Sequence, residues 1–182
     1  MISKIYAFGE THHGQHVEDL KKFFKNFDGK LQGIFLEWPN DYQSFVNNYI
    51  KTGKISERME RAFKGALKEG NNIENEMLVI WNFCKINSIP CICIDSSKTL
   101  NAEYQTKSLI GNWYLKNESR DADMFAVVEN ILKEKKGEYL LICGANHLKE
   151  GLHFRSNTPT LGHRLQNLLG KNFKLIPLSL IN

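Results

Sequence analysis

The sequence contains no long, uninterrupted apolar run. No stretch approaches the roughly 20 apolar residues that a membrane-spanning helix needs. The first ten residues, Met1 to Glu10, also lack the apolar core of a secretory signal peptide. We therefore expect a cytoplasmic protein without a membrane partner.

An excess of charge of one sign is also missing. The 182 residues include 24 basic and 20 acidic side chains, which give a formal net charge of +4. The basic residues are interleaved with acidic ones, and this pattern argues against nucleic acid as a partner. The length fits a single domain, 1–182, which buries roughly 70% of its unfolded surface and needs no disulfide or metal to fold.

Cysteine is scarce, and its spacing matches no zinc site. The four cysteines are Cys84, Cys91, Cys93 and Cys143. Because all four lie in apolar stretches, we interpret them as buried, small hydrophobic side chains in a reducing compartment. No nucleophile elbow occurs either, so the sequence disfavours covalent catalysis.

Short apolar runs and amphipathic segments alternate along the chain. The runs predict strands at residues 4–8, 33–36, 90–94, 139–143 and 173–180. Helical spacing of apolar residues is found within residues 17–27, 42–50, 55–67, 77–84, 124–132 and 161–168. Continuous apolar runs are typical of strands buried on both faces. We therefore predict an α/β fold with a mostly parallel sheet of about five strands and helices on both faces.

Residues 96–119 show the least regular pattern. Long irregular segments that carry aromatic residues often form lids or binding loops, and Trp113 and Tyr114 would then contact the substrate. The alternative is a surface excursion whose aromatic side chains pack underneath it.

Acids or histidines follow each of the first four apolar runs. In chain order they are Glu10, His12, His13, Glu37, Asp95 and His147. Because ligands of open α/β sheets bind outside the carboxyl ends of the strands, these residues predict one polar site. Asp95 and Asn146 are candidates for substrate binding. The alternative is that some of these residues only cap helices in polar loops.

Glu10 is the strongest candidate because it directly follows an apolar strand and Gly9. A carboxylate buried there is costly unless it is paired, and we expect Arg120 or a neighbouring histidine to pair with it. His16, His153 and His163 have no such pattern around them, and we interpret them as capping, surface or structural residues.

Four motifs occur in a familiar order. They are Gly-Glu-Thr-His-His-Gly at 9–14, Glu37, Ser-Arg-Asp-Ala-Asp-Met at 119–124 and Gly-Ala-Asn-His-Leu at 144–148. Together they resemble the erythromycin esterase/ChaN-like superfamily, which includes the TraB and Tiki proteins. The resemblance implies one site made of Glu10, His12 or His13, Glu37, Arg120 and His147. Esterase-like spacing selects His13, whereas ChaN-like and Tiki-like spacing selects His12.

These residues suit hydrolysis of an ester or amide bond in a small molecule or peptide. A histidine beside a carboxylate would activate water, and Arg120 or His147 would stabilise an oxyanion. The same set could hold a divalent metal (Mn, Co or Zn) through Glu10, His12, Glu37 and His147. The alternatives are a cyclase or lyase that uses the same acids and bases, and a non-catalytic ChaN-like module that binds haem or another ligand. Haem is disfavoured because the chain has no lipidation cysteine near its start.

Overall fold

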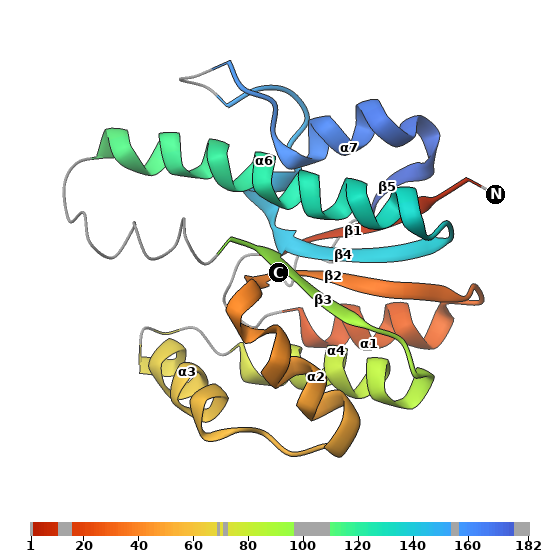
Figure 1. Ribbon diagram of the computed structural model, residues 1–182, viewed down its shortest axis with the longest axis vertical. Coiled ribbons are helices and arrows are strands. Elements are labelled where there is room, and N and C mark those ends of the chain that lie inside the picture. The colour runs from red at the N-terminus through yellow and green to blue at the C-terminus, as the bar shows by residue number, and fades with distance from the viewer. Residues whose placement is uncertain are drawn as a thin grey trace.

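The computed structural model is organised around a single five-stranded sheet (Figure 1). It describes residues 2–10, 16–68, 70, 73–96, 110–153 and 157–176, with 110–118 as backbone. The strands are β1 (Lys4–Glu10), β2 (Leu31–Pro39), β3 (Cys91–Asp95), β4 (Glu138–Gly144) and β5 (Phe173–Ile176). Their order is β3-β2-β4-β1-β5, and every pairing is parallel.

Helices cover both faces of this sheet, as Figure 1 shows. One face carries α1 (Val17–Asn26), α2 (Gln43–Thr52), α3 (Glu57–Lys68) and α4 (Glu74–Asn87); the other carries α6 (Ile110–Glu134) and α7 (Leu161–Leu169). Three short 3₁₀ helices complete the described elements: η1 (Asn40–Tyr42), η2 (Ala145–Leu148) and η3 (Gly170–Asn172). The predicted fold class is confirmed.

The two faces bury separate hydrophobic cores because successive residues of a strand point to opposite sides. Phe8, Leu36 and Ile142 face α1 to α4, where Trp81 is fully buried. Their strand neighbours pack with Met124 and Val128 of α6. Both faces of the central strands are therefore apolar, which explains why their sequences do not alternate.

The chain reverses its direction across the sheet after β3. The connections from β1 through β2 to β3 run on one face, and those from β3 through β4 to β5 run on the other. At such a reversal the loops after neighbouring strands diverge, and a crevice opens at the carboxyl ends of the strands. The strand order places this crevice around the ends of β1, β4 and β2.

Helix α6 begins earlier than the sequence predicts. It starts at Ile110, so residues 110–119 are helical rather than irregular, whereas 97–109 lie outside the described residues. The packed portion around Met124 and Val128 forms the stable part of the helix, and extending an existing helix costs far less than nucleating one. A polar composition was therefore a poor guide to its first turns.

The cysteines are buried and unpaired, as predicted. Gly53 ends α2 with a φ of 76°, a left-handed conformation that glycine adopts without strain. Within the described residues, no helix is both long and apolar enough to cross a membrane.

Candidate functional site

The predicted acids and His147 are buried at the carboxyl edge of the sheet. Glu10 and Asp95 end β1 and β3, Glu37 lies near the end of β2, and His147 lies in η2 directly after β4. Their exposed fractions are 8%, 2%, 9% and 5%, respectively. Ionisable groups are seldom buried to this extent unless they are paired, so their partners determine what the edge can do.

Arg120 of α6 joins the ends of β2 and β3. Its Nη2 donates to Glu37 Oε1 at 2.7 Å and to Asp95 Oδ2 at 2.6 Å, and its Nε donates to Asp95 Oδ1 at 3.2 Å. This planar fork fixes the guanidinium against two carboxylates. Glu37 is thus one of the partners expected for Arg120. Asp95, predicted to bind substrate, lies within this cluster with both carboxylate oxygens on Arg120.

His147 lies between two carboxylates. Its Nε2 is 3.2 Å from Glu37 Oε1, and its Nδ1 contacts Asp121 Oδ1. Burial lowers the pKa of this ring, but the hydrogen bonds and charges of Asp121 and Glu37 outweigh burial and raise the pKa from 6.5 to about 10. His147 is therefore an imidazolium at neutral pH, which suits a fixed cation and not a general base.

Glu37 remains ionised for the same reason. Burial raises its pKa, but the hydrogen bond and charge of His147, the charge of Arg120 and the Gly144 backbone N–H lower the pKa to about 2. Gly144 N donates to Glu37 Oε2 at 2.5 Å, while Gly144 also pairs with Glu10 across the β1–β4 ladder. The end of β4 therefore connects the two predicted glutamates.

Two members of this cluster were missed in the sequence. Asp121 is fully buried and contacts both His147 and His153, whose Nε2 is 2.7 Å from Asp121 Oδ2. Asp121 follows Arg120 and lies three residues before Met124 and seven before Val128, so it falls on the buried stripe of α6. An acid on an apolar helical stripe was the available signal. We call Glu37, Asp95, Arg120, Asp121, His147 and His153 the Arg120 cluster.

Glu10 lies on the other side of the sheet, with α1 and α4. With His16 and Glu76, it lines a small hollow of about 10 Å³, completed by Phe8, Leu20 and Ile142. This volume is close to that of one water molecule. Glu76 is 2% exposed, and its Oε1 accepts the His16 backbone N–H at 2.7 Å. We call Glu10, His16 and Glu76 the Glu10 pocket.

The remaining predicted residues are less fully described. His12 and His13 lie outside the described residues, so the choice between them stays a prediction. Trp113 and Tyr114 lie in the first turns of α6, for which the backbone alone is described. Asn146 is exposed in η2, beside His147.

Glu37 and His147 are poorly suited to hold the metal that the sequence allowed. Both ring nitrogens of His147 face carboxylates, so a metal would have to displace a proton from the ring. Glu37 also uses both carboxylate oxygens, and Arg120 already supplies a positive charge beside it. Within the described residues, no group of three or more acids, histidines or cysteines has metal-binding geometry.

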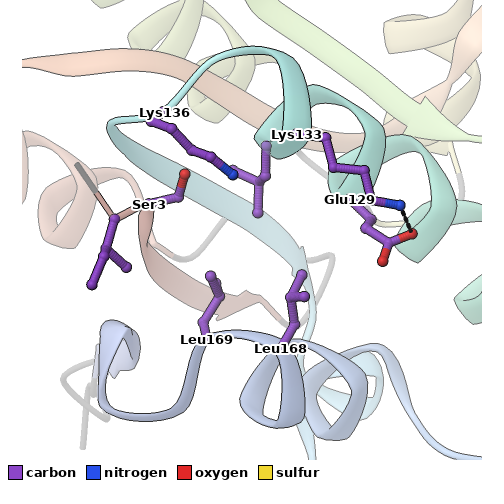
Figure 2. Close-up of a pocket in the computed structure, with 8 residues that line it drawn as sticks. Ser3, Glu129, Lys133, Lys136, Leu168 and Leu169 are labelled. Carbon is purple, nitrogen blue, oxygen red and sulfur yellow. Dashed lines mark ion pairs between the residues drawn. The ribbon is translucent and has the colours of Figure 1, made fainter.

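A second hollow lies at the opposite end of the sheet (Figure 2). Its volume is about 230 Å³, and its lining comes from the start of β1, the end of α6 and α7: Ile2, Ser3, Glu129, Leu132, Lys133, Lys136, Leu168 and Leu169. The dashed line in Figure 2 joins Glu129 to Lys133, whose Nζ and Oε2 atoms are 2.9 Å apart. None of the predicted site residues lines this hollow, so the candidate site stays at the carboxyl edge.

No protein-family model matches the sequence, and no curated protein matches it. Among solved structures, the chain is similar to Pasteurella multocida toxin, with a TM-score of 0.63 and 16% identity over 94% of this chain and 22% of that chain. It is also similar to RRSP, a MARTX toxin effector domain from Vibrio vulnificus, with a TM-score of 0.58 and 18% identity over 90% of this chain and 32% of that chain. A Bacillus cereus protein has a TM-score of 0.52 and 13% identity over 96% of this chain and 65% of that chain.

These likenesses establish a shared fold. The chain spans about a third or less of the two toxin structures. The Pasteurella toxin is described as having a thiol-protease-like catalytic triad in its C-terminal region. That description belongs to the toxin, and at 16% identity it assigns no chemistry to the present chain.

Proposed function

We propose that this chain is a hydrolase that activates water at the carboxyl edge of the sheet and acts on an ester or amide bond. The observation that carries the proposal is the Arg120 cluster, in which buried charges are fixed beside Gly144, the residue that pairs with Glu10. Ionisable groups with strongly perturbed pKa values at a sheet crevice are typical of active sites. Membership of the erythromycin esterase/ChaN-like superfamily is part of the proposal, and the convergence of Glu37, Arg120 and His147 supports it.

In the proposed reaction, Glu10 and one of His12 and His13 prepare the water for attack. Arg120 and His147 supply positive charge that is already oriented when the oxyanion develops, so little reorganisation is needed. Their own carboxylate partners hold them in place. His147 serves as a cation here because its proton is held too tightly for it to act as a base.

The cysteines support a mechanism without a thiol nucleophile. Burial raises the pKa of Cys93 to about 12, and it raises the pKa of Cys143 well above the ordinary value. Thiolates are the reactive form of cysteine, and these side chains stay protonated at neutral pH. Four buried, unpaired thiols also support the proposed reducing, cytoplasmic location.

A panel of ester and peptide substrates tests the function. We expect Glu10→Gln to lower kcat/KM by at least about 100-fold, the scale typical of general acid–base groups. We expect a similar loss in one of His12→Ala and His13→Ala. Glu74→Gln, an exposed substitution of the same kind in α4, is the matched control and should retain activity. Hydrolysis that survives in Glu10→Gln and in both histidine variants would refute the proposal.

The same variants separate the other readings of the site. A cyclase or lyase would consume substrate without incorporating oxygen from ¹⁸O-labelled water. A non-catalytic haem module would instead give a Soret band on titration with haem and no turnover. Activity that survives a chelator would support the metal-independent mechanism, and activity that is lost and then restored by Mn or Co would contradict it.

A further inference from the structure

Asp121 is the most fully engaged side chain in the Arg120 cluster. Its side chain has an exposed fraction of 0%. One carboxylate oxygen contacts His147 Nδ1; the other is 2.7 Å from His153 Nε2 and accepts the Leu161 backbone N–H at 3.1 Å. A buried carboxylate with three donors keeps a defined orientation and can impose that orientation on its partners.

We propose that Asp121 is a positioning residue that holds His147 as an imidazolium against Glu37 and ties the chain after η2 to the site through His153. The catalytic part of this role rests on the proposed hydrolytic function. The charge and orientation of His147 do not, because they follow from the contacts of the folded chain alone.

The hydrogen-bond inventory gives the charge of His147 directly. An ionised carboxylate can only accept, so the His147 Nδ1 that contacts Asp121 must carry a hydrogen. Nε2 of the same ring faces Glu37, whose own ionisation is favoured by Arg120 and Gly144. A ring with a carboxylate at each nitrogen carries a hydrogen at each, and that ring is an imidazolium. Asp121 and Glu37 therefore determine its charge together.

The other neighbours of His147 do not replace Asp121. Arg120 opposes a positive ring but is held by Asp95 and Glu37. Cys143, at the end of β4, is held protonated because burial raises its pKa. Glu10 lies across the sheet, and Arg164 of α7 donates to the Pro159 carbonyl. Asp121 is therefore the acid that determines where Nδ1 points.

His153 extends the same arrangement to the chain that follows η2. Residues 149–153 leave the site, and the His153 N–H donates to the Thr158 carbonyl in a turn that returns to α7. The His153 side chain is 12% exposed and reaches back to Asp121. One carboxylate thus fixes a cation of the site and the segment at its rim, which explains why it is fully buried between them.

The test replaces the charge of Asp121 while keeping its shape. Asp121→Asn retains an oxygen acceptor and loses the negative charge, and Asp123→Asn makes the same change at an exposed position of the same helix. The readout is the pH titration of the His147 ring by nuclear magnetic resonance, assigned with His147→Gln. We expect Asp121→Asn to lower the titration midpoint by about 1–3 pH units and Asp123→Asn to leave it unchanged.

Activity provides a second, separate readout. Asp121→Asn should lower kcat about 10-fold or more, change KM by less than about threefold and move the alkaline limb of the pH–rate profile to lower pH. An unchanged His147 titration in a folded Asp121→Asn protein would overturn the proposal. If that variant does not fold, the ring nitrogens of the unmodified protein at pH 8 decide, because a neutral His147 there would overturn it equally. A lowered midpoint in a protein without hydrolytic activity would support Asp121 and refute the proposed function.

Discussion

The two sides of the carboxyl edge use buried acids in contrasting ways. In the Arg120 cluster, Glu37, Asp95 and Asp121 are matched by cations or histidines at hydrogen-bonding distance. In the Glu10 pocket, two carboxylates and His16 surround a hollow the size of a water molecule. The first arrangement fixes charge, and the second leaves room for a small reactant. We infer that one side provides the electrostatic frame and the other the reacting groups.

Removing the central cation should damage the frame most. Arg120→Leu leaves Glu37 and Asp95 buried without their partner, and breaking a buried pair in this way costs about 3–5 kcal/mol of unfolding free energy. Arg58→Leu is the matched control, because its 2.7 Å pair with Asp41 is 44% and 41% exposed and should be worth less than about 1 kcal/mol. Urea denaturation of both variants measures the difference, and equal losses would contradict the contrast between buried and exposed pairs.

The pH dependence of stability should identify the same frame. His147 has a folded-state pKa of about 10, above its ordinary 6.5, so its contribution is complete below pH 6.5 and lost as pH rises toward 10. Glu37 has a folded-state pKa of about 2, below its ordinary 4.5, so its contribution is complete above pH 4.5 and lost as pH falls toward 2. Stability from this pair should therefore be greatest between pH 4.5 and 6.5.

Thermal unfolding across pH 3 to 10 measures this profile. His147→Gln should flatten the alkaline limb, whereas a substitution in the Glu10 pocket should leave that limb in place. An alkaline limb of unchanged steepness in His147→Gln would assign the effect to other groups.

A smaller effect is expected on the opposite side. Glu76→Gln keeps an oxygen for the His16 backbone N–H but removes the charge, so we expect a loss of about 1–2 kcal/mol. Glu74→Gln, two residues earlier and exposed, should change stability by less than about 0.5 kcal/mol. If Glu76→Gln were as damaging as Arg120→Leu, the Glu10 pocket would also be a charge frame, and the proposed division of roles would fail.

The strand ends could be predicted because the signal there is local. An acid directly after a buried strand, as at Glu10 or Asp95, stands out in the sequence, and parallel strands bring such ends together. Asp121 escaped prediction because apolar residues alone were used to find the buried face of α6. The partition of Glu10 and Glu37 onto opposite sides depends on strand order and residue parity across β1, β4 and β2, which are properties of the assembled sheet.

The strand order also affects how the chain folds. In the sheet, β1 lies between β4 and β5, and its first residue, Lys4, pairs with Glu138. During synthesis, β1 therefore emerges long before either neighbour exists, and its apolar residues must wait for the later strands. Contacts of such large sequence separation slow folding and leave the chain open to aggregation or chaperone capture in the meantime. We expect the edge that carries Glu10 to be among the last parts of the nascent protein to acquire protection from hydrogen exchange.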